Sequence, residues 1–307
     1  MEILMGEDDF AKQMADELKM EFVKVNTSIF PDSEIKPLIE NEDKIKGNKI
    51  LLVIRTDRFR PSINDSIMKI YFICRTLKNA EEVNLFLPYM FYSRQDKKFL
   101  PGEPESFSDI ADFYESLGIK NIFTVNSHLY GKEKTLQDYF KQIKIHDISS
   151  SKLFAGYLKT KDLKNPIVLG PGAGPAVMVK ELAEMLNAPY ECLVKERNHK
   201  TQQIFMKSPN TDLKYRDVII YDDVAASGGT IVKTFKLAKK FKPNRIFIVI
   251  SHLLTKGGIK KLYRLNSDEI ITTNSFVSEE PIKFTELSFT GLLSANDYHL
   301  YKSLFTY

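Results

Sequence analysis

Short apolar runs alternate with amphipathic segments along most of this chain. The runs that predict strands are Ile50–Ile54, Val83–Leu87, Ile122–Val125, Ile167–Leu169, Val218–Tyr221 and Ile246–Ile250. Between them lie segments with helical spacing, such as Phe107–Leu117, which Gly118 closes, and Val177–Leu186. Strands that are apolar along their length and separated by helices are typical of parallel sheets covered on both faces. The pattern therefore predicts an α/β fold.

The chain has 307 residues, of which 43% are hydrophobic, enough for one large domain or two ordinary ones. An internal sequence similarity, called the sequence echo below, favours two domains. Asn121–Lys132 matches Arg245–Lys256 at seven of twelve aligned positions. Apolar strands produce such matches by chance, so the echo is only suggestive. We expect two similar domains, residues 1–145 and 146–283. The aromatic-rich stretch 284–307 is expected to return and pack on the first.

The strongest candidate site follows the run Val218–Tyr221. Two adjacent carboxylates, Asp222 and Asp223, come directly after it, and a turn of small residues then leads into a predicted helix. The turn residues are Ala226, Ser227, Gly228, Gly229 and Thr230. Glycines let the backbone close around an anion, and hydroxyl and N–H groups at a helix start donate to it. Two acids before glycine are also ordinary turn chemistry. Carboxylates beside a buried strand, however, are costly unless they meet a cation or hydroxyls, which indicates a site for ribose phosphate or a metal.

A second candidate site is the loop Leu87–Pro104, which follows a predicted strand and precedes a predicted helix. It mixes aromatic, cationic and turn residues, among them Arg94, Gln95 and Asp96. One interpretation is a solvated surface loop with some aromatic packing. The other is a nucleotide site, in which rings sandwich a base and cations meet phosphates.

Both segments resemble motifs of a known family. Val218–Thr230 is similar to the phosphoribosyl diphosphate loop shared by type I phosphoribosyltransferases and ribose-phosphate diphosphokinases. Leu87–Pro104 is similar to the Pro-Tyr-x-x-Tyr-x-Arg-Gln-Asp…Gly-Glu-Pro segment of the diphosphokinases, where Arg-Gln-Asp takes part in ATP binding. Plain phosphoribosyltransferases lack this segment, so the resemblance is to the diphosphokinase family.

Further matches occur in that family's order between about residues 28 and 250. Phe30-Pro31-Asp32-Ser33-Glu34 resembles the Phe-x-Asp-Gly-Glu stretch that reads adenine, with serine in place of glycine. Ile63–Met68 resembles a helix start of the family, and Val194–Arg197 resembles its Lys-x-Arg catalytic hairpin. His128 matches the histidine of the family's Asp-Leu-His metal motif.

The resemblance implies two similar type I phosphoribosyltransferase-like domains, each a mostly parallel sheet flanked by helices, and a homo-oligomer, either a dimer or a hexamer. It implies transfer of the β,γ-diphosphate of ATP to the C1 hydroxyl of ribose 5-phosphate, giving phosphoribosyl diphosphate and AMP, with Mg²⁺ as cofactor. The implied roles are catalytic cations for Lys195 and Arg197; ATP binding for Phe30, Asp32, Glu34, Arg94, Gln95, Asp96 and His128; ribose-phosphate binding for Asp222, Asp223, Ala226, Ser227, Gly228, Gly229 and Thr230; and metal binding for His128, Asp222 and Asp223.

Three departures from the family pattern remove acids. Asn126 replaces the aspartate of Asp-Leu-His, Gly172 replaces the aspartate of a Pro-Asp-x-Gly turn, and Ala226 stands where Asp or Ser often lies. Losing carboxylates weakens Mg²⁺ binding. Three hypotheses therefore stay open: the reaction on ribose 5-phosphate, the same chemistry on a larger acceptor such as ADP-ribose, and a non-catalytic regulatory relative. Retention of Lys195 and Arg197 argues against the third.

Composition excludes several other classes of protein. The net charge is only +4, and the basic run Lys239–Lys242 suits a helix end, so we expect no nucleic-acid partner. No apolar run reaches the length of a membrane span and no signal peptide opens the chain, so we expect no membrane association. Cys74 and Cys192 lie in apolar stretches, which indicates reduced thiols and a cytoplasmic location.

Overall fold

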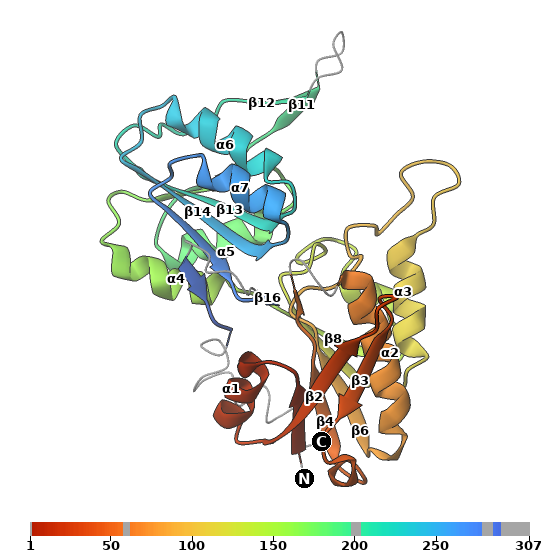
Figure 1. The fold of residues 1–307 in the computed structure, drawn as a ribbon. Helices are drawn as coiled ribbons and strands as arrows, with labels where there is room; N and C mark the ends of the chain where they lie inside the picture. Colours follow the sequence, from red (N-terminus) through yellow and green to blue (C-terminus); the bar gives the residue numbers. More distant parts are fainter. Residues whose placement is uncertain (1, 58–61, 198–203, 278–284, 290–307) are drawn as a thin grey trace. The chain divides into compact units, whose positions relative to one another are not determined.

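The structure is a computed structural model, and it describes residues 2–57, 62–197, 204–277 and 285–289 (Figure 1). The chain divides into two compact units. Unit 1 comprises residues 1–129 and 134–148 and also takes in Phe289, whereas unit 2 comprises residues 130–133 and 149–288. Each unit has its own sheet and its own core.

The sheet of unit 1 has the strand order β3-β2-β1-β4-β6-β7-β8. Its strands are β1 (Glu2–Gly6), β2 (Glu21–Ile29), β3 (Ile35–Ile39), β4 (Lys49–Val53), β6 (Glu82–Phe86), β7 (Asn121–Val125) and β8 (Lys144–Ile148). All neighbouring strands are parallel except β3, which runs antiparallel to β2 at the edge. The helices are α1 (Asp9–Leu18), α2 (Ile63–Thr76) and α3 (Ser106–Glu115). Helices α2 and α3 lie on one side of the sheet and α1 lies on the other (Figure 1).

The sheet of unit 2 has the order β10-β9-β13-β14-β15-β17 and is parallel throughout. Its strands are β9 (Ile167–Gly170), β10 (Tyr190–Cys192), β13 (Asp217–Ala225), β14 (Arg245–Leu253), β15 (Glu269–Thr273) and β17 (Thr285–Leu287). The helices are α4 (Ser151–Leu158), α5 (Ala176–Met185), α6 (Gly229–Lys239) and α7 (Lys256–Tyr263). A separate antiparallel hairpin, β11 (Lys195–Arg197) and β12 (Ile204–Met206), lies between β10 and β13 in sequence. Two-residue strands β5 (Thr56–Asp57) and β16 (Phe276–Val277) complete the strands of the described chain.

The central strand β13 shows why its middle, Val218–Tyr221, has no polar residue on either face. Val218 and Ile220 pack into one core cluster together with residues of α6 and α7. Ile219 and Tyr221 pack into another cluster, together with residues of α4 and α5. Successive side chains of a strand point to opposite faces, so a strand covered on both faces needs apolar residues throughout. The prediction of two similar α/β units with mostly parallel sheets is confirmed.

The two units have the same topology, but the two segments of the sequence echo do not lie at equivalent positions in the two sheets. Strand order in the two sheets matches β4 with β13, β6 with β14, and β7 with β15. The echo instead aligned β7 with β14, which is one strand out of place. Its matching residues reflect the common apolar composition of buried parallel strands rather than the duplication.

The ends of β7 and β15 carry a better match. Thr124, Asn126 and Ser127 of unit 1 correspond to Thr272, Asn274 and Ser275 of unit 2. The backbone agrees as well, because the N–H of Asn126 donates to Ile148 O at 3.0 Å and that of Asn274 donates to Leu287 O at 3.0 Å. This correspondence, found through the strand order, supports the duplication.

The C-terminal stretch differs in part from expectation. Residues 284–307 were expected to return to the first domain, but Thr285–Leu287 form β17, paired in parallel with β15 of unit 2. The edge of β15 otherwise lacks a neighbour, and β17 completes its backbone ladder. Phe289 groups with unit 1, and residues 284 and 290–307 lie outside the described part of the chain.

Candidate active site

The predicted acidic pair lies at the carboxyl end of β13. Asp222 is 8% exposed and Asp223 is half-buried. The Asp223 N–H donates to Asp222 Oδ1 at 3.2 Å, which holds the first carboxylate against the backbone. In parallel α/β sheets, ligands bind beyond the carboxyl ends of the strands. The position therefore suits carboxylates that meet a ligand rather than the core.

The turn after β13 leaves the start of α6 open to an anion. Gly228 is the N-cap residue and has a φ of 68°, a left-handed conformation that favours glycine. The N-cap residue has no side chain to cap α6, and Gly229 N donates a long hydrogen bond to Ser227 Oγ at 3.5 Å. The first N–H groups of a helix have no partner within it and carry the positive end of the helix dipole. Unit 2 therefore brings Asp222, Asp223 and the Ser227–Thr230 turn together around a potential phosphate site.

The neighbouring strand β9 ends in a second open turn. Gly170 closes the strand, and Pro171–Gly174 leads into α5, whose N-cap is Pro175 without a side-chain hydrogen bond. Gly172, where the family pattern has an acid, is buried in this turn. Two adjacent helices of unit 2 thus begin without a side-chain cap at the same sheet edge.

The hairpin that carries Lys195 and Arg197 starts at this edge. Leu193 N donates to Gly170 O at 2.9 Å, and Lys207 N donates to Val194 O at 2.9 Å. The first bond ties the base of the hairpin to the end of β9, and the second joins its two arms. The backbone of Lys195 pairs with Met206, and the side chains of residues 195–197 lie outside the described part of the chain.

The stretch predicted to read adenine is the tight turn between β2 and β3. Asp32 Oδ1 accepts from Glu34 N at 3.1 Å, and Phe30 N donates to Glu34 O at 2.8 Å. Ser33 has a φ of 75°, which explains why the family pattern has glycine at this position. Phe30 is 46% exposed, so its ring is available to stack on a base.

The Arg94-Gln95-Asp96 segment lies on a braced loop after β6. Gln95 N donates to Tyr92 O at 2.8 Å, and the Tyr139 hydroxyl donates to Asp96 O at 2.9 Å. Arg94 and Gln95 are exposed, whereas Asp96 is half-buried. The braces hold the backbone and leave the two exposed polar side chains for a ligand.

Two aromatic residues of this loop are not accessible to a base. The nucleotide-site interpretation has rings that sandwich a base, but Tyr89 and Phe91 are 6% and 1% exposed, with ring centroids 6.2 Å apart. They pack inward because the residues directly after a buried strand continue its core. Phe30 and Phe99, which is 63% exposed, are the accessible rings near these motifs.

His128 follows β7 on a turn that a buried carboxylate fixes. Ser127 donates to Asp147 on β8, from its N–H at 3.1 Å and from its hydroxyl at 2.5 Å. The Ser127 hydroxyl also accepts from Leu129 N at 3.2 Å. Burial raises the pKa of Asp147 to about 6, outweighing the two donors that lower it. Sequence reasoning missed Asp147, because it lies on the next strand and belongs to none of the recognised motifs.

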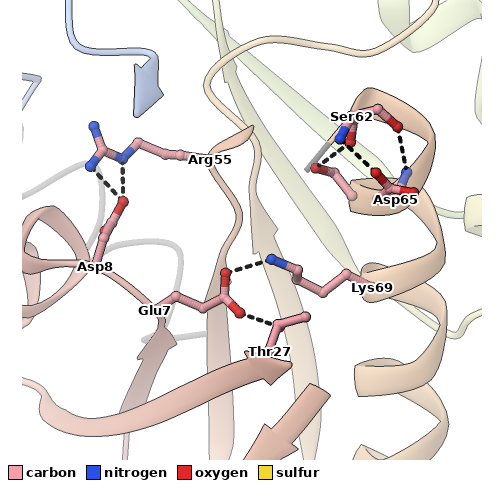
Figure 2. A network of polar contacts seen from close by, with 8 residues as sticks. Glu7, Asp8, Thr27, Arg55, Ser62, Asp65 and Lys69 are labelled. Carbon is pink, nitrogen blue, oxygen red and sulfur yellow. Dashed lines mark hydrogen bonds and ion pairs between the residues drawn. The ribbon is translucent and has the colours of Figure 1, made fainter. Parts of the chain in front are cut away.

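A network of charges occupies the carboxyl edge of unit 1 (Figure 2). Glu7 pairs with Lys69 of α2 at 2.5 Å and accepts from the hydroxyl of Thr27. Asp8 pairs with Arg55, with Nε at 2.8 Å, and also caps α1 by accepting from Ala11 N at 3.0 Å. Lys69 is 2% exposed, and its ion pair with Glu7 offsets part of the cost of burying the ammonium group. Sequence reasoning missed this network too.

The predicted metal ligands belong to different units. His128 and the ATP-site residues lie in unit 1, whereas Asp222 and Asp223 lie in unit 2. Among the described residues, no group of three or more His, Cys, Asp or Glu is arranged to hold a metal ion by itself. The predicted ligands are therefore described separately for each unit. Helices long and apolar enough to cross a membrane are also absent from the described residues.

Fold and site together define a two-unit protein of the phosphoribosyltransferase type. Residues 2–118 match the family model described as the N-terminal domain of ribose phosphate pyrophosphokinase, and residues 138–285 match the phosphoribosyl transferase domain. A ribose-phosphate pyrophosphokinase of Saccharolobus solfataricus is 31% identical over 287 residues, which cover 90% of this chain and 93% of the relative. The chain belongs to the ribose-phosphate pyrophosphokinase family, as the motifs predict.

Two more comparisons agree. A ribose-phosphate pyrophosphokinase of Methanobrevibacter smithii is 28% identical over 286 residues, covering 88% of this chain and 92% of the relative. The crystal structure of phosphoribosylpyrophosphate synthetase from Mycobacterium smegmatis matches with a TM-score of 0.82 at 22% identity, covering 98% of this chain and 99% of that one. The structural match shows that both units share its fold.

Proposed function

We propose that the chain transfers the β,γ-diphosphate of ATP to the C1 hydroxyl of ribose 5-phosphate, giving phosphoribosyl diphosphate and AMP. The observation that carries the proposal is the edge of unit 2, where Asp222 and Asp223 directly precede the uncapped start of α6. Carboxylates that suit ribose hydroxyls and backbone N–H groups that suit a phosphate follow each other here, which supports the proposal. Membership of the pyrophosphokinase family and the retained Arg94-Gln95-Asp96 segment add ATP as the second substrate.

The proposed chemistry is a displacement at phosphorus. The C1 oxygen forms a bond to the β-phosphorus, the bond from that phosphorus to the oxygen bridging the α-phosphate breaks, and AMP leaves. Catalysis of such transfers rests mostly on positioning and on neutralising charge. We assign the charge to Lys195 and Arg197, and the 5-phosphate to the Ser227–Thr230 turn.

The residues present fit Mg²⁺. It prefers oxygen ligands and is commonly held by one or two carboxylates together with substrate phosphates and water. Asp222 and Asp223 of unit 2 supply such carboxylates, and we also propose metal binding for His128 of unit 1 on the family's motif. Bound Mg²⁺ would neutralise charge on the diphosphate. Asn126 and Gly172 stand where the family pattern has two acids. Oxygen atoms of the substrates would therefore supply more of the Mg²⁺ ligands.

The binding of ATP is assigned to unit 1. Phe30 offers an exposed ring for the adenine, and Asp32 and Glu34 lie on the same turn. Arg94 and Gln95 are exposed on their braced loop. The larger acceptor and the non-catalytic relative are not favoured, because the relatives that span most of this chain are named for a ribose-phosphate acceptor.

We also propose a homo-oligomer, dimer or hexamer, in the cytoplasm. Exposed apolar side chains support the oligomer, since Ile29 on β2 and Leu38 on β3 are 54% and 59% exposed at the sheet edge. Apolar groups at an exposed edge are typical of an interface. Light scattering during gel filtration measures the oligomeric state.

AMP release tests the function directly. The protein is incubated with ATP and Mg²⁺, together with ribose 5-phosphate or ADP-ribose. We expect AMP and phosphoribosyl diphosphate with ribose 5-phosphate. If AMP is released only with ADP-ribose, the acceptor is ADP-ribose and not ribose 5-phosphate. If no AMP is released with either acceptor, the proposed enzymatic function is wrong.

A further inference from the structure

We propose that Thr255 and Gly258, at the start of α7, are positioning residues that orient the turn after β13 for the ribose 5-phosphate. The proposal rests on the function proposed above. Neither residue belongs to a recognised motif, and both act through the backbone of Ala225–Ser227, called here the cradle turn. The inference adds a second layer of residues behind the phosphate site.

Two hydrogen bonds join the cradle turn to the segment before α7. Leu254 N donates to Ala225 O at 3.0 Å, continuing the ladder between β13 and β14. The Thr255 hydroxyl donates to Ala226 O at 2.6 Å. The same hydroxyl accepts from Gly258 N at 3.0 Å and so caps α7. One side chain therefore fixes the start of α7 and a carbonyl of the turn together.

The direction of these carbonyls decides where the N–H groups point. In a planar trans peptide the C=O and the following N–H point in opposite directions. Because the carbonyls of Ala225 and Ala226 point toward the segment before α7, the N–H groups of Ala226 and Ser227 point away from it. Ser227 is an exposed residue, and the proposal assigns its N–H to the bound phosphate. Successive N–H groups held in this way form an anion-binding concavity.

Gly258 sets how closely α7 approaches the turn. A Cβ at this position would lie 2.4 Å from Ala226 O, far inside van der Waals contact. That oxygen belongs to the backbone, so a larger residue would have to displace the turn or the helix. A Cβ on Gly228, whose φ is 68°, would lie 3.4 Å from Gly258 O. The two glycines thus allow α6 and α7 to begin in contact around the cradle turn.

Steady-state kinetics with both substrates tests the proposal. Thr255→Val removes the hydroxyl at nearly constant volume, and Thr255→Ser keeps it. We expect the valine variant to raise KM for ribose 5-phosphate by about three- to tenfold, the range expected for one hydrogen bond, with KM for ATP unchanged. The serine variant is expected to restore the wild-type KM. Gly258→Ala is expected to raise KM further, because the backbone itself must move.

A matched control separates orientation from loss of a surface hydroxyl. Thr160 is exposed and donates to Tyr157 O at 2.7 Å, after α4 and away from the cradle turn. Thr160→Val is expected to leave both KM values unchanged. Thermal melting of each variant shows whether it is folded, and isothermal titration with ribose 5-phosphate measures its affinity without turnover.

The outcomes distinguish this inference from the proposed function. If the wild-type protein releases no AMP and does not bind ribose 5-phosphate, the proposed function is wrong. If the wild-type protein is active and Thr255→Val keeps its KM for ribose 5-phosphate, the positioning role is wrong. Equal increases in KM for both substrates would also contradict it, because they would indicate general damage.

Discussion

The two units share one topology yet begin their equivalent helices differently. In unit 1, α2 starts with a capping box: Ser62 Oγ accepts from Asp65 N at 3.2 Å, and Asp65 accepts from Ser62 N at 2.6 Å (Figure 2). Its counterpart α6 has Gly228 at the N-cap and no side-chain cap. The next pair repeats the contrast, because Asp8 caps α1 whereas α5 has no side-chain cap. In unit 1, α1 and α2 therefore have their starts capped by the unit's own side chains, Asp8 and Ser62.

The charges at the two sheet edges are reversed. Gly6 and Gly170 end the matching strands β1 and β9, and the adjacent strands pair Met5 with Leu52 and Leu169 with Ile220. Leu52 and Ile220 are therefore equivalent positions. Three residues further along each chain segment, Arg55 of unit 1 is equivalent to Asp223 of unit 2. The following turns differ in the same way: unit 1 supplies Glu7 and Asp8, and unit 2 supplies Pro171 and Gly172.

The contrast shows how one fold serves two purposes. Cations and carboxylates of unit 1 neutralise each other, so its edge contributes to the stability of the fold. In unit 2, α5 and α6 begin without a cap from the N-cap side chain and follow glycine-containing turns, which favour a bound anion. A site whose polar groups are arranged to bind a ligand generally contributes less to the stability of the fold. Variants should therefore affect turnover in unit 2 and unfolding in unit 1.

The largest effect is expected at the hairpin that only unit 2 carries. Unit 1 has β3 at the equivalent point of the chain, where it joins the sheet, whereas β11 pairs with β12 alone. Lys195→Ala is expected to lower kcat by about 10³-fold, because it removes a cation from the transferring diphosphate. ATP binding, measured by titration calorimetry, is expected to stay within about twofold, because the same principle assigns this charge to the transition state.

A surface lysine provides the control for Lys195. Lys180 on α5 is exposed and lies 3.8 Å from Glu184, so Lys180→Ala removes a cation of the same type from unit 2. It is expected to leave kcat unchanged. Full turnover by Lys195→Ala would show that Lys195 is not catalytic. The hairpin would then give unit 2 no catalytic cation at this position.

The second largest effect is expected at Asp223, which occupies in unit 2 the position that Arg55 occupies in unit 1. Asp223→Asn keeps the size of the side chain and removes its charge, so we expect kcat/KM to fall by about 10²-fold and the Mg²⁺ concentration needed for half-maximal rate to rise. The melting temperature should change little, since the half-buried acid serves the ligand. A large loss of stability with normal turnover would place Asp223 among the structural acids, like Asp8.

The converse effect is expected for Glu7 in unit 1. Glu7→Gln leaves the buried ammonium of Lys69 without a negative partner, so the free energy of unfolding should fall by about 2 kcal/mol. Urea denaturation followed by circular dichroism measures this change. Turnover per folded molecule should stay at the wild-type value. Reduced turnover with unchanged stability would show that unit 1 also uses its charged edge for function.

The alternation of apolar strands and helices was sufficient to predict the α/β class. It predicted β13 as Val218–Tyr221, whereas the strand runs from Asp217 to Ala225. Backbone pairing with β14 continues past the apolar residues, so the two carboxylates belong to the strand itself. Hydrophobic pattern detects the buried part of a strand and cannot show where its hydrogen bonds end.

The parts that sequence reasoning missed depend on contacts between distant residues. Asp8 and Arg55 are 47 residues apart, and Glu7 and Lys69 are 62 apart. Nothing local to these residues indicates their partners. The inward packing of Tyr89 and Phe91 was missed for a related reason, since a loop has no periodicity that assigns a side chain to the core or to solvent.

A smaller effect should appear in the pH dependence of stability. The pKa of Asp147 is raised by burial from 3.8 to about 6, so the folded chain binds its proton more tightly than the unfolded chain does. The contribution of Asp147 to stability therefore falls as pH rises from about 4 to about 6. Asp147→Asn removes this change and keeps an acceptor for Ser127. Allowing for partial exposure, wild type should lose roughly 1–2 kcal/mol relative to the variant over this range.

Two neighbouring groups make the measurement specific. His146 is stacked on Phe123 with ring centroids 4.6 Å apart, and burial lowers its pKa to about 4. Its contribution rises over the same pH range, but it cancels in the difference between wild type and variant. In unit 2 the position of Asp147 corresponds to Glu286, which is exposed. A flat difference for Asp147→Asn would contradict the assigned burial effect.

The smallest effect tests the capping contrast itself. Ser62→Ala removes the N-cap hydroxyl of α2, and the free energy of unfolding should fall by about 1 kcal/mol. Ser227→Ala removes the hydroxyl beside the start of α6, where it lies 3.5 Å from Gly229 N, so little stability should be lost. Its effect should instead be a higher KM for ribose 5-phosphate. Equal losses of stability in the two variants, with unchanged KM, would mean that both helix starts are structural. The ligand-binding difference between the units would then depend on the charges at Arg55 and Asp223 alone.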